Sequence, residues 1–68
     1  MEKMSLRALR VNVGYTQEEA ANMLKINKKT LYNWENGTSY PSVDKIPDIC
    51  ELYGTSYDRI NFLLKNPL

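Results

Sequence analysis

Residues 16–37 decide the fold, and they read TQEEAANMLKINKKTLYNWENG. Thr16 followed three residues later by Glu19 matches a capping box, which predicts that a helix begins directly after Thr16. Asn27 is a favourable N-cap for a second helix, and the pair Asn36-Gly37 predicts where that helix ends. The stretch therefore predicts two short helices in direct succession.

The connection between these two helices is short. Residues 24–27 link them, and the small side chains of Ala20 and Ala21 let the second helix cross the first closely. A short turn and a second helix that is free to enter the major groove are what a helix-turn-helix requires. We therefore expect a helix-turn-helix over residues 17–36.

Apolar side chains at helical intervals predict further helices before and after this helix-turn-helix. Residues 5–13 place apolar side chains at helical intervals and end before Gly14, a typical helix stop. A fourth helix is expected between Ser42 and Gly54. Pro47 fits only in the first turn of a helix, so this helix starts late or bends.

A fifth helix is expected to begin after Ser56, with Ile60 on its apolar face. No segment alternates apolar and polar residues over the length of a strand. The prediction is an all-α fold, a compact five-helix bundle in a single domain over residues 1–68. Residues 65–68 are expected to form a flexible tail.

The composition excludes several classes of function. The chain has 68 residues, one cysteine (Cys50) and no histidine. An internal disulfide, a Cys/His zinc site and catalysis by a histidine base are therefore excluded, and we expect neither a metal nor a cofactor. No apolar run approaches the roughly 20 residues of a membrane span, so a cytoplasmic protein is expected. Cys50 lies on an apolar stripe and should be an inert, buried thiol.

The second helix of the predicted motif has a polar face of unusual composition. At about 100° per residue, five of its polar side chains fall within one arc of about 140°. They are Lys28, Lys29, Tyr32, Asn33 and Asn36. Leu31 and Trp34 fall on the other side and are expected in the core. The polar groups suit base edges and phosphates, although an ordinary solvated face is the alternative.

At this point the sequence resembles a known family, the Cro and lambda-repressor type of helix-turn-helix, often called the XRE family. The resemblance runs from about Leu6 to Leu63 and is most specific in the Trp-Glu-Asn-Gly run at its distance from Thr-Gln-Glu-Glu. It implies a lambda-repressor-like five-helix fold that binds operator DNA as a dimer and regulates transcription.

The resemblance also implies roles for individual residues. The base-reading positions are Lys28, Lys29, Tyr32 and Asn33. The positions that contact the DNA backbone are Thr16, Gln17, Asn36, Thr38, Ser39 and Tyr40. Gln17 is also expected to brace the recognition helix. Arg10 and Glu35 are expected to form a structural ion pair, with two solvated surface charges as the alternative.

The sequence departs from the family pattern at several positions, including Lys25, Asn27, Thr55 and the loop over residues 38–40. Lys25 stands where the family usually has a glycine, often in the left-handed conformation. Either a lysine there costs on the order of 1 kcal/mol, or the turn differs slightly from that of the family. The loop over residues 38–40 carries no basic side chain, so its phosphate contacts should be neutral and weaker.

The apolar end of the chain allows two interpretations. Phe62, Leu64 and Leu68 either close the core or make a two-fold contact with another copy of the chain. We favour the dimer contact. The expected partners are therefore double-stranded DNA, with a palindromic operator, and a second copy of the protein, with no small-molecule ligand and no membrane.

These observations lead to one preferred function. We expect a sequence-specific transcriptional regulator of the repressor or Cro type, with residues 28–35 as the recognition helix in the major groove. It would be a minimal regulator or the DNA-binding fragment of a longer repressor. The near-neutral charge supports the alternative, a protein-interaction module of the same fold, of antitoxin or anti-repressor type. An enzyme is not expected.

Overall fold

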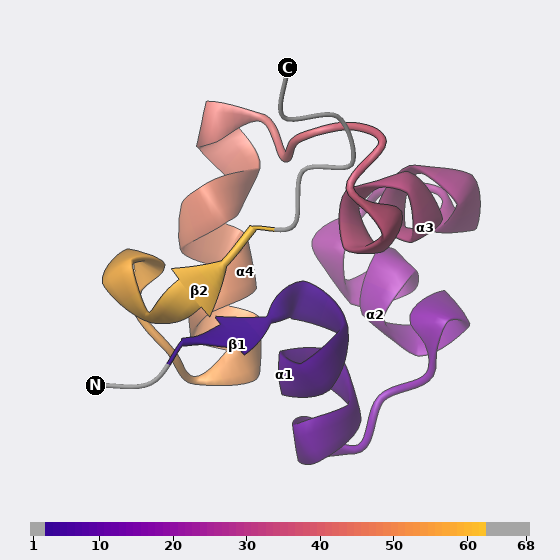
Figure 1. The fold of residues 1–68 in the computed structure, drawn as a ribbon. Coiled ribbons are helices and arrows are strands. Elements are labelled where there is room, and N and C mark those ends of the chain that lie inside the picture. The colour runs from indigo at the N-terminus through magenta and orange to yellow at the C-terminus, as the bar shows by residue number, and fades with distance from the viewer. Residues whose placement is uncertain (1–2, 63–68) are drawn as a thin grey trace.

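The structure is a computed structural model that describes residues 3–62. In chain order the elements are β1 (Met4–Ser5), α1 (Leu6–Val13), α2 (Gln17–Leu24), α3 (Lys28–Asn36), η1 (Val43–Lys45), α4 (Ile46–Tyr53), η2 (Tyr57–Arg59) and β2 (Ile60–Asn61). Figure 1 shows α1, α2 and α3 packed on one side and α4 on the other, with the short β1–β2 pair closing the molecule between α1 and α4.

Helices α2 and α3 begin at the predicted caps, Thr16 and Asn27, and α1 begins after a cap at Ser5, where the first helix was expected to start. The Ser5 hydroxyl accepts a hydrogen bond from the Ala8 amide at 3.1 Å. Thr16 and Glu19 form both bonds of the capping box, at 3.1 and 2.9 Å. The Asn27 side chain accepts from the Thr30 amide at 2.9 Å. Because each cap satisfies backbone amides that the helix leaves unpaired, these starting points are local and readable from sequence.

The same three helices end in left-handed residues. Gly14 and Gly37 have φ values of 90° and 81°, and Lys25 has a φ of 60°. Of the two alternatives for this turn, Lys25 therefore takes the left-handed conformation of the family glycine, and the turn keeps the family geometry. Its amide still donates to the Asn22 carbonyl at 3.1 Å, which closes α2 in the usual way.

The fourth helix takes the late start that Pro47 allowed. A single 3-10 turn, η1, precedes α4, and Pro47 lies in the first turn of α4. A proline is tolerated there because its missing amide has no partner within a helix in any case. The helix ends before Gly54, as predicted.

The expected fifth helix is wrong for the residues that the structure describes. After Ser56 the chain makes the 3-10 turn η2 and then extends as β2, which pairs in parallel with β1, Ile60 opposite Met4. The apolar spacing is equally satisfied by a turn followed by a strand. Ile60 is β-branched, has an extended backbone (φ −97°, ψ 128°) and is buried, so pairing with β1 prevails over helical propensity. The predicted tail and the helix residues beyond Phe62 lie outside the described part.

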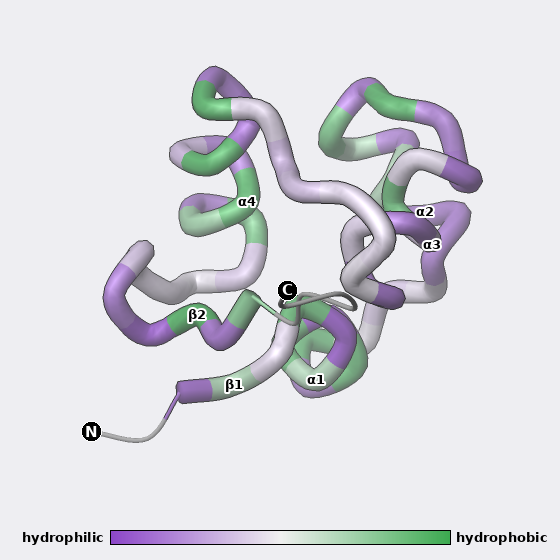
Figure 2. The backbone as a smooth tube through the Cα atoms, turned by 45° about the horizontal axis from the view of Figure 1, so that its top comes forward, coloured by the Kyte–Doolittle hydropathy of each residue, from purple (hydrophilic) through white to green (hydrophobic). Residues whose placement is uncertain are grey.

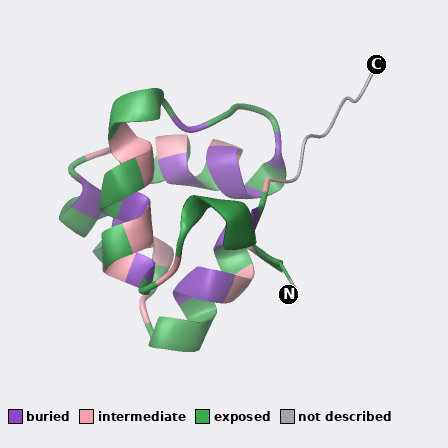
Figure 3. Cartoon of the chain, turned by 90° about the vertical axis from the view of Figure 1, so that its left-hand side faces the viewer, coloured by how far each residue is buried: buried purple, intermediate pink, exposed green. Residues whose placement is uncertain are grey.

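The core lies between the inward faces of the helices, as Figure 3 shows. Its largest fully buried side chains are Leu31 of α3 and Ile49 of α4. Ala20 and Ala21 are also buried, which permits the close crossing of α2 and α3. Cys50 packs against this core but is half-buried and not fully buried as expected, and burial raises the pKa of its thiol.

Replacing Lys25 by glycine is expected to stabilise the fold. The left-handed backbone costs a residue with a Cβ atom about 1 kcal/mol, and the freedom of glycine in the unfolded chain offsets part of the gain. We expect Lys25→Gly to raise the free energy of unfolding by about 0.5 kcal/mol, measured by urea titration. Lys25→Ala removes the same ammonium but keeps Cβ. An equal gain in the alanine variant would assign the effect to charge.

Candidate nucleic-acid interface

Helix α3 presents the predicted polar face to solvent. Lys28, Lys29, Tyr32 and Asn36 are exposed and Asn33 is half-buried, whereas Leu31 and Trp34 are buried on the opposite side. One face anchors the helix, and the other offers two ammonium groups, a phenol and two carboxamides. These groups can donate to and accept from base edges and phosphate oxygens.

A buried ion pair joins α1 to α3. Arg10 Nε donates to Glu35 Oε2 at 2.7 Å and Arg10 Nη2 donates to Glu35 Oε1 at 3.1 Å. The side chains are only 10% and 4% exposed. The paired interpretation of Arg10 and Glu35 is therefore confirmed, and the fork-to-fork geometry fixes their relative orientation. The hydrogen bond to Glu35 is the main reason why the pKa of Arg10 is raised.

Two further hydrogen bonds extend this pair, one to α2 and one to the loop between α1 and α2. Gln17 Nε2 donates to Glu35 Oε1 at 3.0 Å, and Arg10 Nη1 donates to the Tyr15 carbonyl at 2.9 Å. Gln17 thus braces the recognition helix, as the family resemblance implied. The four residues, which we call the Arg10–Glu35 network, connect the first three helices at the base of the polar face.

Tyr53 of α4 lies near the same network. It is 4% exposed, and its hydroxyl has no hydrogen-bond partner among the described residues. Burial, followed by the charge of Glu35, raises the pKa of Tyr53 to about 12. The phenol is therefore neutral at physiological pH, and it adds no charge beside the ion pair.

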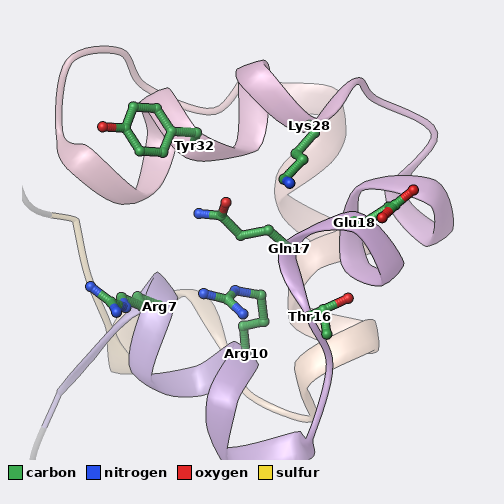
Figure 4. Close-up of a pocket in the computed structure, with 7 residues that line it drawn as sticks. All are labelled: Arg7, Arg10, Thr16, Gln17, Glu18, Lys28 and Tyr32. Atoms are coloured by element: carbon green, nitrogen blue, oxygen red, sulfur yellow. The ribbon is translucent and has the colours of Figure 1, made fainter.

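A hollow of about 580 Å³ opens in front of the network. It is lined by Arg7, Arg10, Thr16, Gln17, Glu18, Lys28 and Tyr32. Figure 4 shows the Gln17 side chain between the two arginines of α1 and the Lys28 and Tyr32 side chains of α3. Arg7, Lys28 and the amino end of α2 all favour an anion at this place.

Sequence reasoning missed Arg7. It lies in the first turn of α1, where the positive end of the helix disfavours a cation and where acidic residues are absent. A cation in that position contributes nothing to helix stability. Its unfavourable placement could therefore have identified Arg7 as a candidate binding residue from the sequence. The structure brings Arg7 to the same hollow as the predicted residues Thr16, Gln17 and Lys28.

The loop after α3 is held by contacts within the protein. The Thr38 hydroxyl donates to the Asn33 carbonyl at 3.1 Å, and Ser39 is exposed. The Tyr40 ring packs against Phe62 with centroids 4.9 Å apart, and Tyr57 packs against the same ring at 5.7 Å. Residues 38–42, which link α3 to η1, are pale in Figure 2 because they include no strongly hydrophilic residue. Phe62 lies after β2, not on the predicted helix.

The fold and the exposed polar face of α3 define a helix-turn-helix domain, the DNA-binding module of transcriptional regulators. A helix-turn-helix domain family model matches residues 5–66, so the chain belongs to this family. Among its relatives, it is 38% identical over 55 residues to the HTH-type transcriptional regulator ImmR of Bacillus subtilis (strain 168), covering 81% of this chain and 43% of the relative.

Two other relatives are also named as transcriptional regulators. The cryptic phage CTXphi transcriptional repressor RstR of Vibrio cholerae is 33% identical over 54 residues, 79% of this chain and 49% of the relative. The HTH-type transcriptional activator BcrR of Enterococcus faecalis is 27% identical over 55 residues, 81% of this chain and 27% of the relative. The chain spans less than half the length of these curated relatives.

No solved structure matches the chain. Among the described residues, no helix has both the length and the apolar character needed to cross a membrane.

The Arg10–Glu35 pair should behave as one unit in a double-mutant cycle. Arg10→Met or Glu35→Gln leaves a buried group without its partner, and each should lower the free energy of unfolding by about 3 kcal/mol. The double variant should lose clearly less than the sum of the single losses, because no uncompensated charge remains. Urea unfolding measures all four proteins. Additive losses would show that the two side chains act independently.

Proposed function

We propose that this chain binds duplex DNA sequence-specifically and thereby regulates transcription. The observation that carries the proposal is the exposed polar face of α3, which the buried Arg10–Glu35 network orients from behind. A fixed helix with hydrogen-bonding side chains on its free side is suited to the major groove. Membership of the helix-turn-helix family supports the same function.

Base reading is assigned to four side chains of the recognition helix, residues 28–35. Asn33 can make a bidentate contact with adenine, and Lys28 or Lys29 can donate to guanine. Tyr32 is 51% exposed beside Lys28 and Lys29, and it supplies an aromatic ring and a hydroxyl to the same surface. Half-burial of Asn33 limits its rotamers, which favours one defined contact.

Backbone contacts are assigned to the rim of the 580 Å³ hollow and to the ends of the motif. Arg7, Thr16 and Gln17 would hold one phosphate, assisted by the positive end of α2. Asn36 and the loop residues Thr38, Ser39 and Tyr40 would contact the next backbone segment through neutral groups. Because the net charge of the chain is only +1, its affinity for DNA depends on a few well-placed contacts.

We further propose that two copies bind one palindromic operator in the cytoplasm, with no cofactor. One short helix reads only a few base pairs, and two-fold symmetry doubles the readout on half-sites about 34 Å apart. Phe62, Leu64 and Leu68 are proposed as the contact between copies. Phe62 packs against the core on one side and is only half-buried, and its ring lies tilted against the exposed rings of Tyr40 and Tyr57, which supports an accessible apolar surface here.

Two alanine variants test the assignment of roles. Asn33→Ala should weaken binding to the preferred site by about 1–3 kcal/mol and relax preference at one base pair. Arg7→Ala removes a phosphate contact, so it should weaken binding to preferred and random duplexes alike and reduce the salt dependence of the affinity. Fluorescence anisotropy after selection of a site from a random duplex pool measures both. Equal losses for Asn33→Ala on the two duplexes would rule out base reading by Asn33.

The dimer is tested by stoichiometry on a palindromic duplex. We expect two protomers per duplex with cooperative binding, and Phe62→Asp or Leu68→Asp should abolish the cooperativity. Because Phe62 also contacts Tyr40 and Tyr57, melting curves must show that the variant remains folded. Val43→Asp adds the same charge at an 84% exposed site and serves as the control. A one-to-one complex at saturation in analytical ultracentrifugation would refute the proposal.

A further inference from the structure

A second hollow lies where α2 packs against α4, and the DNA-binding proposal makes no use of it. Its volume is about 420 Å³, and it is lined by Tyr15, Met23, Leu24, Asp48, Glu51 and Leu52. No residue is shared with the hollow in front of the Arg10–Glu35 network. We call it the α2–α4 groove.

Four of the six side chains that line the groove are apolar or aromatic, and three of these are accessible. Met23 is 55% exposed, and Tyr15 and Leu52 are only half-buried. Methionine is unbranched and polarizable, so it adapts to different apolar surfaces and is common at protein-binding sites. The exposed Met23 side chain has no role in closing the core, against which Tyr15 and Leu52 pack.

The rim of the groove is acidic. Asp48 and Glu51 lie almost one turn apart on α4, both are exposed, and neither forms an ion pair or side-chain hydrogen bond with another described residue. Asp48 lies in the first turn, where a carboxylate stabilises the helix. Glu51 lies in the last turn, where the negative end of the helix disfavours it and no basic residue compensates.

We propose that the α2–α4 groove docks a short amphipathic helix of a partner protein, which inserts an apolar side chain beside Met23 and places lysine or arginine against Asp48 and Glu51. Helix-in-groove recognition of this kind needs an apolar channel and complementary charge at its edge. The two carboxylates repel duplex DNA, so the groove and the DNA-binding face select different classes of ligand. The partner can then bind while α3 occupies a major groove.

The direct test is a titration of the isotope-labelled protein with a short helical peptide of leucine, alanine and lysine, followed by NMR. The control peptide carries glutamate in place of every lysine. We expect shift changes centred on Met23, Glu51 and Leu52 with the lysine peptide and none with the control. Changes centred elsewhere, or equal binding of both peptides, would overturn the proposal.

Variants separate a defined groove from general attraction between opposite charges. Asp48→Asn with Glu51→Gln should weaken peptide binding about fivefold, as expected for two exposed ion pairs. Met23→Asp should abolish it, and its exposure makes loss of folding easy to check by melting. Asp44→Asn changes an exposed carboxylate of η1 outside the groove and should have no effect. An equal loss in Asp44→Asn would refute a defined site.

DNA binding by the same variants distinguishes failure of this inference from failure of the proposed function. None of the substituted residues belongs to the DNA-binding face, so Met23→Asp should retain base-pair preference on duplex DNA. Loss of that preference in the folded variant would show that the groove and the DNA-binding face are not independent, and it would overturn the proposal.

Discussion

The Arg10–Glu35 ion pair is the constraint on which the arrangement of the other helices depends. Two charges that are 10% and 4% exposed must satisfy each other, because each alone would carry a large desolvation cost. Their planar groups meet at 2.7 and 3.1 Å, which permits little change in the angle between α1 and α3. Such a pair contributes more to a unique geometry than to the free energy of folding.

The rest of the motif is set by local backbone chemistry around that constraint. Caps at Ser5, Thr16 and Asn27 start three helices, and left-handed residues stop them. The turn at Lys25 is strained, because a residue with a Cβ atom has a left-handed backbone conformation that suits glycine. Lys45 Nζ donates to the Leu24 carbonyl beside this turn at 2.8 Å, so a distant segment supports the connection between α2 and α3.

Features that depend on interactions between residues close in sequence could be predicted, and features that depend on distant residues could not. The ends of α1, α2 and α3 could be read from the sequence because caps and stops act within four residues. The last segment could not, because the conformation of Ile60 depends on pairing with Met4 at the other end of the chain. Apolar spacing alone does not distinguish a helix from a turn followed by a strand. In the site, Arg7 escaped notice because its neighbours across the hollow are distant in sequence.

The pairing of β1 with β2 has a consequence for the order of folding. It joins the first and last elements that the structure describes, so it is the contact with the longest loop to close. The helix-turn-helix, in contrast, is built from neighbouring segments. On a ribosome the three caps and the crossing of α2 over α3 are available as soon as residue 37 has emerged, whereas β1 waits for its partner until residue 61 is synthesised. The strand pair therefore forms after the helix-turn-helix, once both of its segments are available.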